Sequence, residues 1–338
     1  FLCTFAVFVM TANAEVVIKM GHAGMTDDSA GAVGSAKFKE LVEKYSNGEI
    51  KVDIFGKAQM GGEQQMTQAL QLGTLEMQWI ATNNLTPRVP SLGYFNLPFI
   101  VKSVAAAERL QEGSWDFAQA ATIKQANVRL VGWEVMGFRV FFNSQRPINS
   151  VEDMKGLIWR VPKDDILVGN YEAWGVSPQP MAWHELFNAL TQEVVHGGGN
   201  PWDDIVTAKL YEPCKYLTPM HYHVLSHCII IAEPFFQKLT PQQQEWVTAA
   251  GKGMTDYMKY HMKYITEPEK IAFLKAVPGI KINTPSNEES FFIAQDNWPK
   301  FYKSIGAGDE KLGEQIVKEA AEIASFKREK FSDNLIFK

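Results

Sequence analysis

The first part of the chain alternates between two hydrophobic periods. Residues 16–20 form an apolar run rich in β-branched side chains, and residues 50–55 place apolar side chains at every second position, which is typical of strands. Residues 36–45 have apolar side chains at helical spacing, and residues 63–72 repeat that pattern before Gly73. This strand–helix–strand–helix order predicts an α/β fold with a mostly parallel sheet covered by helices on both faces.

A second block of the same kind begins near Gly132. A Ser-Val-Glu-Asp sequence starting at Ser150 has the form of a helix capping box. The predicted strands and helices of this block are residues 140–142 and 157–161 (strands), 165–174 (a helix closed by Gly175) and 184–190 (a helix). Two such blocks in a chain of 338 residues predict two domains.

Thr240 and Pro241 have the pattern of an N-cap followed by proline in the first helical turn. The helix that starts there is predicted to run to about residue 267, where Pro268 should stop it. A helix of ~27 residues is ~40 Å long, which exceeds the width of one domain. We therefore expect this helix to lean across both domains.

Residues 1–14 differ from the rest of the chain because they carry no charge and end in Ala12-Asn13-Ala14, the A-x-A form of a signal-peptidase site. The basic segment that normally precedes such a site is missing, so we interpret residues 1–14 as a partial signal peptide that is cleaved near Ala14. The alternative is an N-terminal strand or a short buried helix. A transmembrane span needs ~18 or more apolar residues, and no later stretch is that long. The sequence predicts an exported protein.

Charge and cysteine content narrow the function classes only slightly. The chain has 33 Lys and Arg against 38 Asp and Glu, a net charge of −5, and no basic cluster of the kind that binds nucleic acid. Nucleic acid is therefore excluded as a partner. Cys3 falls in the predicted signal, which leaves Cys214 and Cys228 either as a disulfide or as two free thiols.

The sequence contains none of four common enzyme motifs: G-x-S-x-G, the P-loop, G-x-G-x-x-G after a strand, and H-E-x-x-H. The best metal-like feature is the trio His221, His223 and His227, which would share one side of a strand, with Glu233 nearby. A secreted metal-dependent enzyme using these three histidines is one hypothesis. Separate hydrogen-bonded or surface histidines are the alternative.

Arg160 is a charged residue inside the apolar strand predicted at residues 157–161, near its carboxyl end. A buried, unpaired charge costs several kcal/mol, so Arg160 needs an anionic partner. Ligands bind at the carboxyl ends of parallel strands, and a guanidinium fork suits a carboxylate or a sulfonate. The alternative is an internal salt bridge to Asp or Glu. Arg139 raises the same question with less force.

Residues 197–199 are three glycines that lead into Asn200 and Pro201. Proline suits the first turn of a helix, so this pattern predicts a loop followed by a helix with Asn200 as its N-cap. The backbone of such a loop can approach a ligand closely. A phosphate site is not indicated, because the Lys and Ser/Thr of a phosphate cradle are missing.

Nearly the whole chain after residue 14 carries an ordered series of short motifs. They are IFGKAQMGGE (residues 54–63), ALQLG (69–73), VPSL (89–92), FNLPF (95–99), GFR (137–139), RPINSVEDMKG (146–156), WRVP (159–162), WGVSPQPM (174–181), ELFNAL (185–190) and Asn200-Pro201. This series resembles the substrate-binding protein of a tripartite ATP-independent periplasmic (TRAP) transporter, DctP type. The spacing of the Arg-Val-Pro, G-x-x-P-x-P-M and E-x-x-x-A-L motifs makes the resemblance specific.

The resemblance implies a two-lobed periplasmic-binding-protein fold: two α/β domains joined by crossing strands at a hinge, with a long helix spanning both. We expect lobe I to comprise residues 15–136 plus 227–267 and lobe II residues 137–226 plus 268–338. Such a protein, in the periplasm, captures a small organic acid by lobe closure and delivers it to TRAP permease subunits, as a monomer, with no catalysis and no cofactor or metal. A ligand sensor on the same fold is a further alternative.

The family's ligand residues map onto seven positions of this sequence. The arginine that binds the ligand carboxylate matches Arg160, and a second arginine found in parts of the family matches Arg139. The remaining matches are the ligand asparagine at Asn200, an aromatic lining residue at Trp183, and Thr82, Asn83 and Asn84 in a loop expected to close over the ligand. Where the family usually has an acidic residue followed by Gly-Gln-Glu, this chain has residues 196–199, His-Gly-Gly-Gly. We interpret this departure as a changed specificity pocket and leave the acid open, carboxylate or sulfonate, aromatic or aliphatic.

Overall fold

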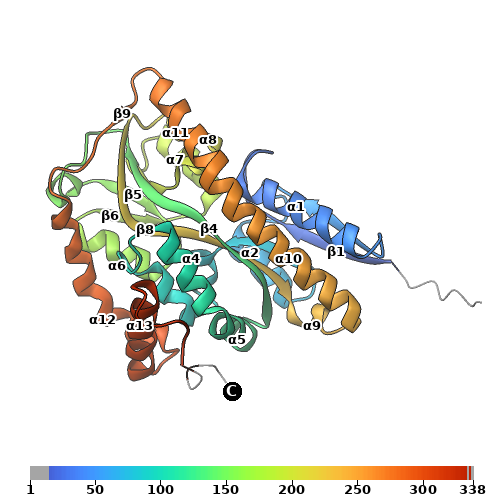
Figure 1. The fold of residues 1–338 in the computed structure, drawn as a ribbon. Helices are drawn as coiled ribbons and strands as arrows, with labels where there is room; N and C mark the ends of the chain where they lie inside the picture. Colours follow the sequence, from blue (N-terminus) through green and yellow to red (C-terminus); the bar gives the residue numbers. More distant parts are fainter. Residues whose placement is uncertain (1–14, 333–334, 336–338) are drawn as a thin grey trace, which may run out of the picture.

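The computed structural model describes residues 15–332 and Leu335, so the predicted signal peptide lies outside the described residues. The strands are β1 (Val16–Gly21), β2 (Ile50–Phe55), β3 (Met77–Ala81), β4 (Val128–Asn143), β5 (Ile158–Val161), β6 (Ser177–Pro180), β7 (Gly197–Asn200), β8 (Tyr216–Ala232) and β9 (Lys281–Ile282). The α-helices are α1 (Ala30–Tyr45), α2 (Glu63–Gln71), α3 (Thr82–Leu85), α4 (Val104–Gly113), α5 (Trp115–Ala126), α6 (Asp165–Ala173), α7 (Leu186–Thr191), α8 (Trp202–Thr207), α9 (Glu233–Phe236), α10 (Pro241–His261), α11 (Glu267–Ala276), α12 (Trp298–Ile305) and α13 (Glu310–Ala324). Short 3-10 helices are η1 (Pro90–Asn96), η2 (Val151–Met154), η3 (Trp183–Glu185) and η5 (Glu288–Asn297), and η4 (Met262–Thr266) is a π-helical turn. Figure 1 shows these elements as layers of helices around a twisted sheet, and the α/β prediction is confirmed.

The sheet is mixed rather than mostly parallel. Within the described residues its main path runs in the order β2-β1-β3-β8-β4-β7-β5-β6, and β9 pairs with β8. Strands β1, β2 and β3 are mutually parallel and form the first lobe, while β5, β6 and β7 form a parallel group in the second lobe. The two long strands β4 and β8 run through both lobes and pair antiparallel with each other, because the chain crosses the molecule once in each direction.

Strand β4 bends shortly before it reaches the cleft between the lobes. Its pairing with β8 shifts register between Val135 and Gly137 and again between Phe138 and Val140. Gly137 has φ 143°, a backbone conformation that side-chain-bearing residues rarely adopt. The bulge therefore depends on glycine here, and it sets the direction from which Arg139 enters the cleft.

The long helix spans both lobes, as predicted, but it does not stop at Pro268. Helix α10 packs on α1 and β4, and after the π turn α11 packs on α8 (Figure 1). In the π turn the amide of Glu267 donates to the carbonyl of Met262, five residues earlier. This shift places Pro268 in the first turn of α11, where the missing N–H costs little.

The other elements predicted from periodicity are present with small changes of boundary. Strand β2 has the predicted bounds, α2 ends before Gly73 with φ 73°, and Ser150 and Asp153 form the predicted capping box. Helix α1 begins six residues earlier than predicted. No helix among the described residues is both long enough and apolar enough to span a membrane.

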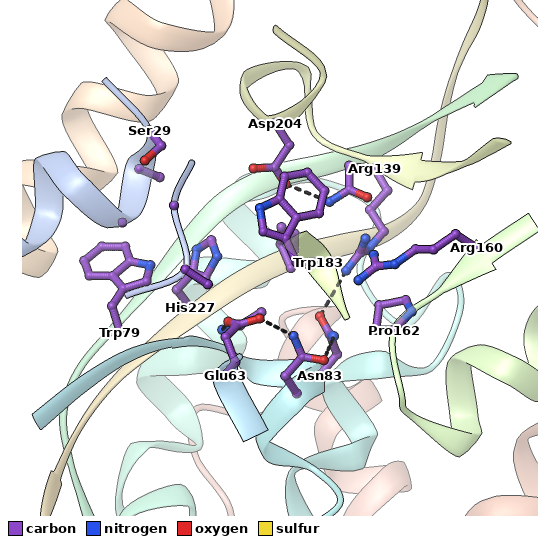
Figure 2. Close-up of a pocket in the computed structure, with 18 residues that line it drawn as sticks. Ser29, Glu63, Trp79, Asn83, Arg139, Arg160, Pro162, Trp183, Asp204 and His227 are labelled. Atoms are coloured by element: carbon purple, nitrogen blue, oxygen red, sulfur yellow. Dashed lines mark hydrogen bonds between the residues drawn. The ribbon is translucent and has the colours of Figure 1, made fainter. Parts of the chain in front are cut away.

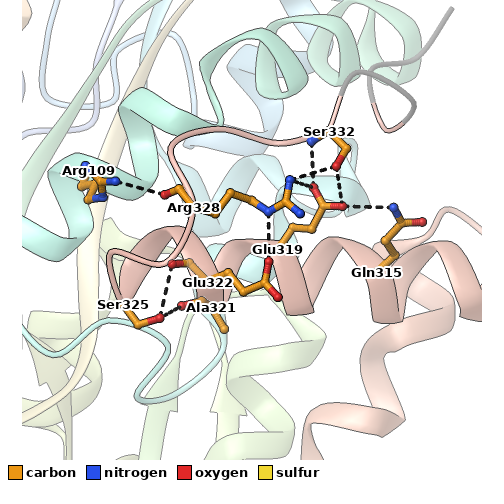
Figure 3. A network of polar contacts seen from close by, with 8 residues as sticks. All are labelled: Arg109, Gln315, Glu319, Ala321, Glu322, Ser325, Arg328 and Ser332. Carbon is orange, nitrogen blue, oxygen red and sulfur yellow. Dashed lines mark hydrogen bonds and ion pairs between the residues drawn. The ribbon is translucent and has the colours of Figure 1, made fainter.

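The last helices pack against the first part of the chain. Helix α12 contacts η1, and α13 contacts α4 and η1. The segment after α13 is fixed to that helix by polar contacts: Arg328 forms ion pairs with Glu319 and Glu322, and the amide of Ser332 donates to Glu319 (Figure 3).

The residue boundaries expected for the two lobes stay a prediction.

Cys214 and Cys228 are both buried and both free, so of the two alternatives the free thiols are correct. Burial raises the pKa of each thiol to about 12, so both are protonated at neutral pH.

Candidate ligand-binding site

A narrow cavity of about 60 Å³ lies between the two lobes, where strand ends and first helical turns meet (Figure 2). Its walls are formed by Ala23, Gly24, Ser29, Ala30, Gly31, Glu63, Trp79, Ala81, Asn83, Asn84, Arg139, Arg160, Pro162, Trp183, Asn200, Asp204, Leu225 and His227. Six of the seven predicted site residues are in this set. The exception is Thr82, which does not line the cavity. Its side chain is buried, and its hydroxyl is hydrogen-bonded to Ser226 Oγ with an oxygen–oxygen distance of 2.7 Å.

Arg139 comes from β4 and is held entirely by protein acceptors. Its Nε donates to His223 Nδ1 at 2.9 Å, its Nη1 to the Gly199 carbonyl at 2.5 Å and its Nη2 to Asn83 Oδ1 at 3.0 Å. Burial, and next the charge of Arg139, hold the pKa of His223 well below its usual value. His223 is therefore neutral, with an unprotonated Nδ1 that can accept the bond.

Arg160 comes from β5 and is held much more loosely. It is 3% exposed, yet within the described residues its only hydrogen bond runs from Nε to the Met181 carbonyl at 3.2 Å. Its guanidinium carbon lies 5.8 Å from the centre of the Trp183 ring, and no described acidic residue forms an ion pair with it. Burial, and next the charge of Arg139, lower the pKa of Arg160 to about 10, so it stays charged at neutral pH. The internal salt bridge considered from the sequence is therefore absent among the described residues.

The glycine run is a strand, not a loop, and Asn200 is not a helix cap. Residues 197–200 form β7, paired with β4, and Pro201 is the N-cap of α8. A Cβ atom at Gly197 would lie 2.2 Å from the Phe142 carbonyl oxygen, and one at Gly199 would lie 2.2 Å from the Tyr222 hydroxyl. Side chains are therefore excluded at these two positions by close packing. Asn200, at the end of β7, lines the cavity and donates from Nδ2 to Asp204 Oδ2 at 2.7 Å.

The segment from Thr82 to Asn84 is the start of the short helix α3 and not a loop, since it follows directly on β3. Asn83 presents its amide to the cavity and accepts from Arg139, so α3 of the first lobe is bonded to a strand shared by both lobes. Asn84 lines the cavity beside it and donates to Glu63 Oε2.

Trp183 lines this cavity, where Figure 2 shows its ring, and it also lines a neighbouring cavity of about 170 Å³. Glu63, Asn84 and Ala23 also line both cavities. Trp183 stands at the start of η3 and is partly buried. Trp183 is therefore one of four residues shared by the walls of the two cavities.

Three further ionisable residues line the cavity: Glu63 and Asp204, which sequence reasoning missed, and His227, which it considered only as a metal ligand. Glu63 accepts from the Ala81 amide at 2.7 Å, and burial raises its pKa; burial also raises the pKa of Asp204. Burial alone would lower the pKa of His227, but its 2.8 Å bond to the buried Glu134, together with nearby acidic charges, raises it overall. The available signal was position: Glu63 and Asp204 both stand in the first turn of a helix that follows a glycine-rich segment.

The three histidines of the metal hypothesis do not converge. His221 lies tilted against the Phe138 ring at 4.5 Å between ring centres, His223 accepts a hydrogen bond from Arg139, and His227 is hydrogen-bonded to Glu134. Glu233 forms a 2.7 Å ion pair with Arg129 instead. Among residues 15–332, no group of three or more His, Cys, Asp or Glu side chains is placed to hold a metal ion. The prediction of convergence is wrong because β8 carries extra residues against β4 between Val224 and Pro219, which interrupts its alternation where His221 and His223 lie.

Comparison with known proteins places this geometry in a family. The model of "Bacterial extracellular solute-binding protein, family 7" (DctP) matches residues 20–304. The chain is 30% identical over 316 residues to the sialic acid-binding periplasmic protein SiaP of Vibrio cholerae, covering 90% of this chain and 95% of that protein.

Two solved structures are similar in fold to this chain. A TRAP periplasmic solute-binding protein from Polaromonas, bound to D-erythronate, is 26% identical with a TM-score of 0.83, covering 91% of this chain and 98% of that one. An open, ligand-free one from Rhodobacter sphaeroides is 32% identical with a TM-score of only 0.75, covering 93% and 100%. The chain belongs to family 7 of the bacterial extracellular solute-binding proteins.

Proposed function

We propose that this protein captures a small organic acid in the periplasm and delivers it to the membrane subunits of a TRAP transporter. The observation that carries the proposal is Arg160, a buried guanidinium without an ion-pair partner among the described residues, in the wall of the cavity between the lobes. Leaving such a charge uncompensated costs several kcal/mol, so an anionic ligand would stabilise the closed protein.

The groups around Arg160 suit an acid group. Its terminal nitrogens make no hydrogen bond to a described residue and can donate to two oxygens of one carboxylate, the strongest form of guanidinium recognition. Asn200 and Asn83 place amides in the same wall, and Trp183 provides an apolar surface. The names of two relatives record acids of this kind, sialic acid and D-erythronate.

Closure of the lobes is the proposed mechanism of capture. Asn83 and Asn84 come from the first lobe, Arg160, Trp183 and Asn200 from the second, and a ligand that contacts both sets stabilises the closed state. The protein is proposed to act as a monomer after removal of the segment up to about Ala14. Size-exclusion chromatography with light scattering would give a mass above one chain if it does not.

A ligand screen tests the proposal. The protein lacking residues 1–14 is unfolded, refolded to remove carried-over ligand, and screened by thermal shift against carboxylates, keto acids, sugar acids and sulfonates, with neutral sugars and amines as controls. Ligand at ~100 times its Kd adds ~2.7 kcal/mol, which raises the melting temperature by several degrees. Stabilisation by acids alone, abolished in Arg160→Met and kept in the exposed-arginine control Arg88→Met, supports the proposal. Stabilisation by neutral sugars or amines alone contradicts it.

A further inference from the structure

One ion pair joins the second lobe to the first outside the wall of the cavity. Lys270 on α11 donates from Nζ to Asp28 Oδ2 at 2.8 Å. Asp28 stands two residues before α1, which lies between β1 and β2 of the first lobe, whereas α11 packs on α8, which follows β7 of the second lobe (Figure 1). Neither residue lines the cavity, so this contact between the lobes does not depend on a ligand-binding side chain.

Lys270 has a second acidic neighbour, and this one belongs to its own lobe. Asp203 stands in the first turn of α8 and is 2% exposed, yet neither of its carboxylate oxygens makes a hydrogen bond of ordinary geometry with a described residue. The charges of Lys270 and Asp203 act on each other. A buried acceptor without a partner is unfavourable, and the structure leaves Asp203 in that condition while Lys270 bonds Asp28 instead.

Opening of the cleft would exchange these partners. A rotation that separates the lobes moves Asp28 away from α11 but leaves α8 and α11 packed on each other. Lys270 then stays beside Asp203 and can pair with it, so the buried carboxylate gains the partner that it lacks here. One cation with two alternative carboxylates, one in each lobe, is thus a contact with two discrete arrangements.

We infer that Lys270 is a switch that exchanges Asp28 for Asp203 when the lobes open, and that this exchange sets the balance between the open and closed forms of the ligand-free protein. Asp28 favours the closed form, because it can pair with Lys270 only when the lobes touch. Asp203 favours the open form, because only there does it gain the cation. The inference goes beyond the proposed function, since it concerns the lobes alone and requires no ligand.

Distances between the lobes of the ligand-free protein test the inference. The protein lacking residues 1–14 is unfolded, refolded to remove ligand, and spin-labelled on cysteines introduced at two exposed positions, Ala36→Cys on α1 and Gln192→Cys after α7. Cys214 and Cys228 are buried and should stay unlabelled. Pulsed electron paramagnetic resonance then gives the ratio of closed to open protein. The measurement is made at pH 8, above the pKa of about 7 to which burial raises the Asp203 carboxyl.

Neutral isosteres of the two carboxylates should shift this ratio in opposite directions. In Asp28→Asn the ratio of closed to open protein should fall about two- to fivefold, the range for a partly exposed ion pair. In Asp203→Asn it should rise about fivefold, because the carboxylate that the closed form leaves without a partner is gone. Glu112→Gln is the matched control: Glu112 pairs with Lys259 at 3.0 Å within the expected first lobe, so the ratio should not change.

A double substitution shows whether Lys270 mediates the effect of Asp28. In the Lys270→Met background, Asp28→Asn should cause no further shift, because the cation with which Asp28 pairs is gone. A full shift in that background would overturn the inference, as would shifts in the same direction for Asp28→Asn and Asp203→Asn, or distance distributions identical to wild type in both. None of these results bears on the proposed function, which the ligand screen decides.

Discussion

Arg139 and Arg160 enter the same cleft from two different strands and are held in opposite ways. Arg139 on β4 makes three hydrogen bonds to protein acceptors, whereas Arg160 on β5 makes one. Both side chains are almost completely buried, so burial alone does not separate them. What separates them is whether the protein itself satisfies the charged group.

The comparison teaches that an incompletely satisfied buried charge is the better indicator of a ligand site. Arg139 ties together His223, β7 and α3, and so acts mainly on the shape of the cleft. The terminal nitrogens of Arg160 make no hydrogen bond to a described residue, and its guanidinium carbon lies 5.8 Å from the centre of the Trp183 ring. The same sequence feature, an arginine in an apolar strand, thus serves two purposes.

The largest expected effect is on ligand affinity when Arg160 is changed to methionine. Removing one partner of a buried charge pair costs about 2–5 kcal/mol, roughly 30- to several-thousand-fold in Kd. The stability of the ligand-free protein should stay the same or rise, because an unpaired buried charge is removed. Calorimetric titration and urea unfolding of the same samples measure both. A variant that binds the acid normally but unfolds more easily would reverse the roles assigned to the two arginines.

Changing Arg139 to methionine should mainly reduce stability. Three buried acceptors lose their donor, each loss costing about 1–3 kcal/mol before relaxation, so the free energy of unfolding should fall by about 2–4 kcal/mol. Affinity should fall less than in Arg160→Met, because any loss follows from a less well-ordered cleft. Urea unfolding of the two variants side by side checks the contrast. Equal stability of Arg139→Met and wild type would show that its three bonds are energetically neutral.

Much of the fold follows from periodicity, and the exceptions have physical causes. Helix α1 was predicted too short because Gly31 and Gly34 weaken the helical pattern in its first turns. A Cβ atom at Gly34 would lie 2.0 Å from the Trp79 ring, so tertiary packing requires glycine there. Strand β7 was missed because glycines have no side-chain pattern to recognise. The π turn before α11 was not predicted, because the proline at position 268 has the same sequence signature whether it ends a helix or follows such a turn.

The site was predicted where a residue contradicts its surroundings and missed where it does not. Arg160 is conspicuous because a charge in an apolar strand needs an explanation. Glu63 and Asp204 are acidic residues in the first turn of a helix, the most ordinary place for them, and the glycine-rich segment before each helix is too weak a signal to single them out. His227 drew attention for the wrong reason, since its partner is Glu134 on the neighbouring strand and not a metal.

Replacement of Trp183 should have a smaller effect on ligand affinity. Its ring lies beside the Arg160 guanidinium and forms part of the cavity wall. Trp183→Ala should join the main cavity to the neighbouring one and remove the ring beside the guanidinium. A cation–π contact at a desolvated site is worth about 1–2 kcal/mol, so affinity for the best small acid should fall about tenfold. Longer acids should lose less or gain. Calorimetric titration with straight-chain monocarboxylic acids of four and six carbons measures the change in Kd. An equal loss of affinity for both lengths would mean that Trp183 does not limit the size of the ligand.

The smallest effect extends the comparison from arginines to a carboxylate outside the cavity. Asp203, on α8 beside Asp204, is 2% exposed, and neither of its carboxylate oxygens makes a hydrogen bond of ordinary geometry. Burial, and next the charge of Asp204, raise the pKa of Asp203 to about 7, although Lys270 and the Ala30 amide act in the opposite direction. Lys270 forms an ion pair with Asp28 at 2.8 Å, so its positive charge acts on Asp28 as well as on Asp203.

The raised pKa gives a definite sign for the dependence of stability on pH. The folded protein holds the Asp203 proton up to about pH 7 whereas the unfolded chain releases it near pH 4, so the stability contributed by this group is present at low pH and is lost as the pH rises through that window. Asp203→Asn removes the loss and should be more stable than wild type by about 1 kcal/mol at pH 8, the low end of the cost of an unpaired buried polar group. The difference should shrink toward pH 4. Thermal unfolding across this range measures it, with the exposed Asp256→Asn as the control. If the difference were constant with pH, Asp203 would be ionised throughout, satisfied by Lys270 and Ala30 as fully as Arg139 is by its three acceptors.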